Sequence, residues 1–316
     1  MDPDRIGGVW PASLTPFDAV GAVDAAALRL HLSDLAGTAG VQALVVNGHA
    51  GEATSLSREE RRSVVGVARS VVGREQFVVA GVIADDARGA VALGRDAAEA
   101  GADALLLFPP PLLASGGARR EEMALHFVRE VADRVGLPIV LFQLSIASGH
   151  GFPTETLLRL CREVPAIVAV KEGSDLPAAY EDNLAALRNL DRKVAVLTTN
   201  NTWLMSSLAH GGDGILSGLG SVASPLLVEL HAAIVRRDLQ AARAANERLR
   251  PLCRVFYRAP GCDMHNRMKT ALHLLGRLPC PDPRPPLLPI TAGERAEIAE
   301  ALHGAGLMTR RIAAAA

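Results

Sequence analysis

The sequence predicts an α/β fold, a (β/α)8 TIM barrel followed by a C-terminal helical domain. Eight short aliphatic segments alternate with helical patterns over roughly 220 residues, which matches such a barrel in number and size. Most of these segments are continuous apolar runs, which are typical of parallel strands covered on both faces. A doubly wound open sheet is the alternative, but no glycine-rich phosphate loop follows the first segment.

The strands and helices of the barrel follow one another in a regular order. The strands are expected at Gly8–Ser13, Ala43–Asn47, Phe77–Val82, Ala104–Phe108, Ile139–Phe142, Ile167–Lys171, Val194–Thr198 and Gly214–Ser217. The helices are expected at Ala25–Ala36, Arg58–Val72, Ala87–Ala100, Arg120–Val135, Thr154–Arg162, Leu176–Leu190 and Thr202–His210. Ser57 and Glu60 form a capping-box pattern before the second helix, and glycines 73, 101 and 136 fall where helices should end.

After Ser217 the pattern becomes entirely helical. Four helices are expected, at Pro225–Val235, Leu239–Arg254, Asp263–Leu275 and Ala292–Leu302. We therefore expect two domains, a catalytic barrel over residues 1–221 and a helical appendage over residues 222–316.

Composition and charge exclude several classes of function. The 33 basic and 34 acidic residues give a net charge of −1, and no segment concentrates positive charge, so no nucleic-acid partner is expected. The longest apolar runs are about half the roughly 20 residues that a membrane-spanning helix needs. The charged N-terminus has no apolar signal segment, and the four cysteines show no CxxC spacing or metal-ligand pattern. These features predict a cytoplasmic protein with free thiols.

Lysine is rare in this chain, because only Lys171, Lys193 and Lys269 occur among 33 basic residues. Lys171 ends an apolar strand, so its amine should enter the mouth of the barrel, where active sites of this fold lie. Burial there lowers the pKa of a lysine and frees its lone pair to attack a carbonyl, which arginine cannot do. The alternative is a structural ion pair, for example with Glu172.

Five short motifs occur in an order that resembles a known family. They are Thr15-Pro16-Phe17 with Asp24, Gly48-His49-Ala50-Gly51-Glu52, Leu56-Ser57-Arg58-Glu59-Glu60-Arg61, Val170-Lys171-Glu172, and Gly212-Asp213-Gly214 with Ser217-Gly218. Along nearly its full length the chain resembles the dihydrodipicolinate synthase / N-acetylneuraminate lyase family of class I aldolases. The resemblance implies a barrel with a C-terminal helical domain, typically a homotetramer, and Lys171 as the imine-forming residue.

The chain also departs from that family at three places. Phe142 stands where the family has a proton-shuttling tyrosine after strand five, and Phe108-Pro109-Pro110-Pro111 replaces a Pro-Tyr-Tyr segment after strand four. The segment Gln143–Gly149 lacks the arginine that binds the synthase's dicarboxylic substrate. We therefore expect neither a true dihydrodipicolinate synthase nor an N-acetylneuraminate lyase.

The resemblance assigns further residues to the substrate. The amides of Gly48, His49 and Ala50 and the hydroxyls of Ser13 and Thr15 would hold the carboxylate. His49 replaces a family threonine and would either transfer protons, as an imidazole near neutral pKa can, or only position the substrate.

Other residues near the strand ends are further candidates for the site. Thr199 and Asn200, with Asn201, would bind the distal part of the substrate or simply cap the helix that follows. Gln143 and Ser217 also end strands, and Phe142 would line the site. Glu52 is expected to orient its loop, and Asp263, His265 and Asn266 form too weak a metal pattern to predict a metal site.

Together these observations predict a Schiff-base lyase that acts on a 2-oxo acid, as an aldolase or a dehydratase, with a sugar-acid-like or pyruvate-derived substrate. No cofactor is expected, because the protonated imine itself serves as the electron sink. A homo-oligomer is expected as the assembly. The alternative is a catalytically decayed barrel that binds a small carboxylate as a sensor or scaffold.

Overall fold

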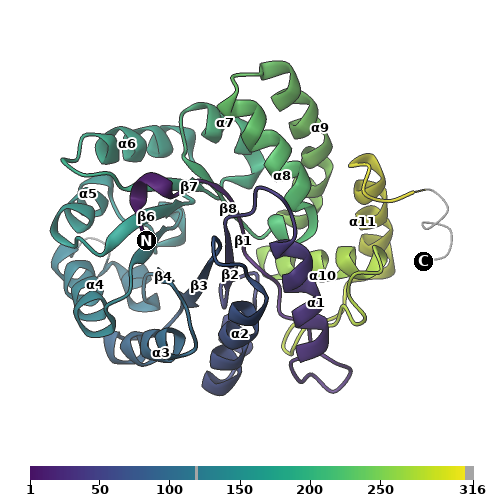
Figure 1. Ribbon diagram of the computed structural model, residues 1–316, viewed down its shortest axis with the longest axis horizontal. Coiled ribbons are helices and arrows are strands. Elements are labelled where there is room, and N and C mark those ends of the chain that lie inside the picture. The colour runs from purple at the N-terminus through teal and green to yellow at the C-terminus, as the bar shows by residue number, and fades with distance from the viewer. Residues whose placement is uncertain (118–119, 310–316) are drawn as a thin grey trace.

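The computed structural model describes residues 1–117 and 120–309, and its centre is an eight-stranded parallel barrel (Figure 1). The strands are β1 (Gly8–Pro11), β2 (Ala43–Val46), β3 (Phe77–Val82), β4 (Ala104–Leu107), β5 (Ile139–Gln143), β6 (Ile167–Glu172), β7 (Ala195–Thr198) and β8 (Gly214–Ser217). They pair in the order β1-β8-β7-β6-β5-β4-β3-β2, and the bridges Val9–Val41 and Ala12–Val45 join β1 to the other edge. The predicted (β/α)8 fold is confirmed.

Helices surround the barrel and continue beyond it (Figure 1). Their bounds are α1 (Ala25–Ala36), α2 (Arg58–Val71), α3 (Ala87–Glu99), α4 (Glu121–Val135), α5 (Thr154–Glu163), α6 (Pro177–Arg188), α7 (Leu204–Ala209), α8 (Gly220–Val235), α9 (Leu239–Phe256), α10 (Met264–Leu274) and α11 (Ala292–Gly304). The capping box of α2 is present, since the Ser57 hydroxyl accepts from the Glu60 amide and the Glu60 carboxylate accepts from the Ser57 amide. In the described part of the chain, no helix has both the length and the apolar character needed to cross a bilayer.

Two helices differ from the sequence prediction for local reasons. Helix α7 begins at Leu204 because residues 201–203 form a 3-10 turn (Asn201–Trp203) instead of α-helix. Helix α8 begins five residues before the predicted Pro225, but its backbone is non-helical at Ala223. Because proline lacks an amide hydrogen and fits the first turn of a helix, the predicted start corresponds to the segment after this kink.

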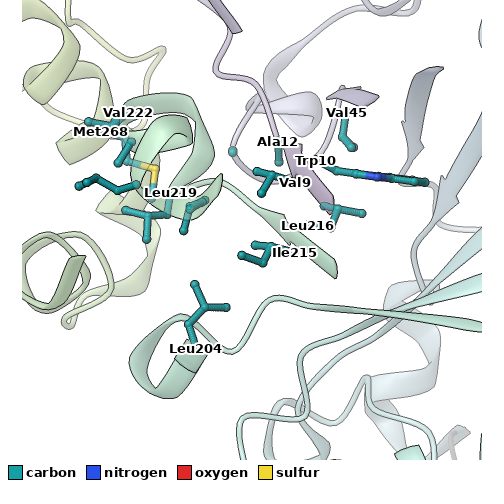
Figure 2. Close-up of a cluster of buried hydrophobic side chains, with 14 of the residues drawn as sticks. Val9, Trp10, Ala12, Val45, Leu204, Ile215, Leu216, Leu219, Val222 and Met268 are labelled. Carbon is teal, nitrogen blue, oxygen red and sulfur yellow. The ribbon is translucent and has the colours of Figure 1, made fainter. Parts of the chain in front are cut away.

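One hydrophobic core runs from the barrel interior into the C-terminal helices. Trp10 of β1 is fully buried, and Figure 2 shows it beside Leu216 of β8, with Leu219 just before α8, Val222 of α8 and Met268 of α10 further along the cluster. The predicted domain boundary at residues 221 and 222 therefore lies inside α8, next to the kink. The C-terminal helices pack on the barrel through this shared core, so they can contribute side chains to its mouth.

Candidate active site

A cavity of about 300 Å³ lies at the carboxyl ends of the strands, where active sites of (β/α)8 barrels are found. Its wall includes many of the residues singled out from the sequence, namely Gly48, His49, Ala50, Phe142, Lys171, Thr199, Asn200 and Asn201. Strands β2, β5, β6 and β7 thus bring together side chains that are up to 153 positions apart in the chain. A volume of this size is typical of small-molecule sites.

Lys171 is the only lysine in this cavity wall as far as the structure describes it. Its side chain extends from β6 and is buried, and its Nζ atom lies 4.0 Å from the centre of the Phe142 ring. Among the described residues, no carboxylate lies within ion-pair distance of this amine. Burial lowers the pKa of the Lys171 ammonium to about 7, so a large fraction is the free amine at neutral pH.

Glu172, the partner considered for a structural ion pair, faces the other side of β6. Its carboxylate accepts hydrogen bonds from Asn200 Nδ2 (2.8 Å) and Asn183 Nδ2 (3.1 Å) and from the Ser174 amide (3.3 Å). Burial raises the pKa of this carboxyl group, while the three donors act in the opposite direction. Glu172 is therefore a buried residue that supports the structure beneath the site through its hydrogen bonds. It does not form an ion pair with Lys171.

The loop after β2 presents unused backbone donors to the cavity. Asn47 adopts φ 56°, which turns the chain sharply after the strand, and its side chain donates to the Arg61 carbonyl at 2.8 Å. The turn fits because Gly81 of β3 has no side chain; a Cβ there would lie 2.1 Å from the Asn47 carbonyl oxygen. The amides of residues 48–51 donate to none of the described residues. They form a group of donors suited to an anion.

His49 projects from this loop into an aromatic cluster. Its ring centre lies 4.8 Å from that of Phe108 and 6.0 Å from that of Phe142, with all three rings in edge-on arrangements. The residue is exposed to solvent at the cavity, although protein atoms pack around its ring. This desolvation, with the nearby charge of Lys171, lowers the pKa of His49 to about 4, so the ring is neutral at pH 7.

Three of the predicted polar contacts to substrate are instead used within the protein. The Ser13 hydroxyl donates to the Leu14 carbonyl, and the Thr15 hydroxyl donates to the Gly51 carbonyl, both at 2.8 Å. Gln143 donates to the Phe152 carbonyl at 2.9 Å and accepts from its amide at 3.2 Å. These side chains stabilise the loops around the cavity, so we do not propose them as substrate contacts.

The loop after β7 is also partly committed to structure. Asn200 bonds the Glu172 carboxylate, and its Oδ1 accepts from the Asp175 amide at 2.9 Å. Thr199 and Asn201 line the cavity, but Asn201 Nδ2 donates to the Thr199 carbonyl at 2.7 Å. Asn200 makes no side-chain cap on the following turn. The capping alternative therefore does not describe this loop, which supports β6 and contributes a polar wall to the cavity.

Sequence reasoning missed Tyr257, which lines the same cavity from the end of α9. Its hydroxyl accepts from the Leu219 amide at 3.1 Å and lies 3.3 Å from Ser217 Oγ. Ser217 Oγ donates to Asn201 Oδ1 at 2.5 Å, so the Tyr257 proton is directed at Ser217. Burial raises the pKa of Tyr257 well above its usual range. The sequence could have drawn attention to Tyr257, because it is one of only two tyrosines in the chain.

Arg267 holds the segment that carries Tyr257. Its guanidinium is fully buried and donates to the carbonyls of Arg258 (2.7 Å) and Pro260 (3.2 Å). These hydrogen bonds and an ion pair with Glu294 at 3.3 Å stabilise the buried charge, and the bonds to carbonyls also fix the backbone around it.

A second buried charge cluster joins the barrel to the C-terminal helices. Glu52, which was expected to orient its loop, contacts Lys269 of α10, and Lys269 Nζ lies 4.0 Å from the Phe17 ring centre. Arg284 lies over the same ring at 4.3 Å and pairs with Glu60. No group of three metal-ligand side chains occurs among the described residues, including around His265.

The fold and the cavity together define a (β/α)8 barrel with a buried lysine in its cavity wall, at the carboxyl end of β6. A model of the dihydrodipicolinate synthetase family matches residues 5–305. The chain belongs to this family and is a lyase of the class I aldolase type. The family resemblance seen in the sequence motifs is confirmed.

Individual relatives agree with this assignment. The chain is 37% identical over 306 residues to a 4-hydroxy-tetrahydrodipicolinate synthase of Kineococcus radiotolerans, covering 95% of this chain and 94% of that protein. YagE, a prophage protein of the same family from E. coli K12 solved in complex with pyruvate, superposes with a TM-score of 0.86 at 25% identity, covering 96% and 100% of the two chains. A monomeric dihydrodipicolinate synthase variant superposes with a TM-score of 0.88 at 24% identity, covering 96% and 98%.

Proposed function

We propose that this protein forms a Schiff base between Lys171 and a 2-oxo acid and acts as an aldolase or a dehydratase. The observation that carries the proposal is the Lys171 amine, which is buried at the cavity, is unpaired among the described residues and has a pKa of about 7. YagE, a member of the same family, was solved with pyruvate, the simplest 2-oxo acid.

The reaction follows from the chemistry of this amine. The Lys171 lone pair attacks the C2 carbonyl, and the resulting carbinolamine loses water to give a protonated imine. This cation accepts the electron pair released when the C3–C4 bond breaks or when a proton leaves C3, which gives an enamine. The free amides of Gly48, His49 and Ala50, which line the cavity, would hold the substrate carboxylate beside the imine.

Two side chains are candidates to act in place of the missing family tyrosine, one by taking up a proton and the other by orienting the substrate hydroxyl. Neutral His49 can accept a proton from a hydroxyl on C4, which is the step that starts carbon–carbon cleavage. Tyr257 accepts from the Leu219 amide and donates toward Ser217, so it can orient a substrate hydroxyl by accepting a hydrogen bond from it, while the proton itself passes to His49. The two groups reach the cavity from the β2 loop and from the end of α9, respectively.

The cavity fits an uncharged distal group better than a second carboxylate. No arginine occurs among the described residues of its wall, which instead offers Thr199, Asn201 and Tyr257. Relatives named 4-hydroxy-tetrahydrodipicolinate synthase suggest that activity. The absence of a described cation for a dicarboxylic substrate, together with Phe142 in place of the tyrosine, favours a hydroxylated, sugar-acid-like substrate.

Borohydride trapping tests the proposal directly. The protein is incubated with pyruvate, reduced, and analysed by intact-mass measurement and peptide mapping. We expect a reduced adduct on the peptide that contains Lys171. Binding of 2-oxo acids without any covalent adduct would instead identify a barrel that has lost catalysis and serves as a carboxylate sensor.

The assembly is a related proposal. We expect a homo-oligomer, as the family resemblance implies. A monomeric dihydrodipicolinate synthase variant is also among the structures that this chain resembles. Sedimentation or light scattering of the purified protein decides between the two states.

A further inference from the structure

The loop that follows β2, residues 47–52, has an uncommon backbone conformation at both of its ends. Asn47 and Glu52 have φ angles of 56° and 52°, in the left-handed region that residues other than glycine rarely adopt. A conformation of this kind persists only where the surrounding structure holds it in place. Between these two residues, the amides of residues 48–50 donate to none of the described residues. The direction of these amides therefore depends on the contacts that hold the two ends of the loop.

Different parts of the molecule hold the two ends. Asn47 is held locally, because its Nδ2 atom donates to the carbonyl of Arg61 in the neighbouring helix α2 at 2.8 Å. Glu52 is held by the C-terminal helices, because one oxygen of its buried carboxylate forms an ion pair with Lys269 of α10. Its other oxygen lies 3.8 Å from Nε2 of His265, one turn earlier in the same helix. Helix α10, which follows the barrel in the chain, therefore fixes the second end of the loop.

The ion pair between Glu52 and Lys269 depends on both of its members. Among the described residues, Glu52 is the only carboxylate within 4.0 Å of Lys269 Nζ, and neither side chain is accessible to bulk solvent. Burial lowers the pKa of the Lys269 amine, while the Glu52 carboxylate opposes this shift. Removal of one partner leaves the other as a buried charge without a counter-ion, which is strongly unfavourable. A Glu52 carboxylate without Lys269 should turn toward water, and the left-handed backbone of residue 52 should relax with it.

We propose that Lys269 is a positioning residue for the substrate carboxylate and acts through Glu52 on the amides of residues 48–50. The proposal rests on the Schiff-base function and gives the C-terminal helices a part in substrate binding. Amides that are already held in one direction bind an anion more tightly than amides that must first be ordered. The ion pair should therefore strengthen binding of a carbonyl compound that carries a carboxylate. It should have no such effect on the attack of Lys171 on an uncharged carbonyl compound.

Two carbonyl compounds of similar size separate these effects. Pyruvate carries the carboxylate, and pyruvamide carries an uncharged amide group in the same place. Each compound is incubated with the protein and cyanoborohydride at concentrations below saturation, and the initial rate of adduct formation on the Lys171 peptide is measured by mass spectrometry. We call the rate with pyruvate divided by the rate with pyruvamide the carboxylate preference. Both rates scale with the amount of folded protein, so a variant that only loses stability keeps the wild-type preference.

Two lysine variants are compared with the wild-type protein. Lys269→Met should lower the carboxylate preference about tenfold, which corresponds to the loss of one hydrogen bond to a charged group. Lys193→Met is the matched control, because Lys193 pairs with Asp213 at 3.2 Å and does not line the cavity, and it should keep the wild-type preference. If Lys269→Met does not fold, the double variant Glu52→Gln/Lys269→Met takes its place. It removes the same ion pair without leaving a buried charge and should also lower the preference.

The outcomes separate the proposed function from this inference. The absence of any adduct on Lys171 in the wild-type protein would overturn the Schiff-base function, and the inference with it. Adducts that form with an unchanged carboxylate preference in the variant without the ion pair would overturn the inference alone and leave the Schiff-base function intact. An equal loss of preference in Lys193→Met would also overturn the inference, because the effect would then not come from the contact between Lys269 and Glu52.

Discussion

Two buried lysines in this molecule lie against similar aromatic rings, but only one of them has a carboxylate partner among the described residues. Lys171 and Lys269 each place Nζ 4.0 Å from the centre of a phenylalanine ring, and both are excluded from bulk solvent. Lys269 contacts the Glu52 carboxylate, whereas Lys171 has no carboxylate partner among the described residues. Burial lowers the pKa in both cases, but for Lys269 the nearby carboxylate counteracts it.

The difference shows how one residue type performs two tasks. A buried ammonium with a counter-ion is held in its charged form and stabilises the contact between two parts of the structure. A buried amine without a counter-ion loses its proton readily and becomes a nucleophile. We therefore propose that the presence or absence of a neighbouring carboxylate decides which lysine joins the barrel to the C-terminal helices and which one reacts.

The largest expected effect comes from removing the nucleophile. Lys171→Arg keeps a positive charge but cannot form an imine, so turnover should fall by at least about 10³-fold and the borohydride adduct should disappear. Lys193→Arg is the matched control, because Lys193 pairs with Asp213 at the far end of β7. Turnover retained in Lys171→Arg would contradict the mechanism.

A smaller effect is expected from the tyrosine that reaches the cavity from the C-terminal helices. Tyr257→Phe should lower kcat by about tenfold, because loss of one hydrogen bond to the substrate hydroxyl removes roughly 1 kcal/mol of stabilisation, while the pyruvate adduct still forms on Lys171. Tyr180→Phe is the control, because Tyr180 is buried outside the cavity and donates to the Ser207 carbonyl at 2.8 Å. Equal kcat values for the two variants would exclude a role for Tyr257 in the reaction.

The second lysine should affect stability more than chemistry. Lys269→Met leaves the Glu52 carboxylate buried without its partner and should lower the free energy of unfolding by about 3 kcal/mol, measured by urea denaturation. The double variant with Glu52→Gln should recover part of this loss. Lys193→Met, which breaks a surface pair with Asp213, should cost under about 1 kcal/mol. A loss for Lys269→Met no larger than this would show that the buried pair adds nothing.

The sequence predicted the barrel and the position of Lys171 because both follow from local pattern. Apolar runs define the strands, and a residue at the carboxyl end of a strand must lie at the mouth of the barrel. Tyr257 could not be placed in this way, because its location depends on how α9 packs back on the barrel. The hydroxyls of Ser13 and Thr15 show the opposite limit: the first strand was expected to end at Ser13 but ends at Pro11, and both hydroxyls donate to nearby carbonyls.

The mildest test varies only the pH. If the Lys171 pKa is about 7, the free amine rises from about one in eleven molecules at pH 6 to about ten in eleven at pH 8. The initial rate of adduct formation with pyruvate and cyanoborohydride should therefore rise about tenfold over this range and level off above it. A rate that continues to rise toward pH 10 would show that the amine titrates like an exposed lysine. The two buried lysines would then differ in their position in the structure but not in their protonation at neutral pH.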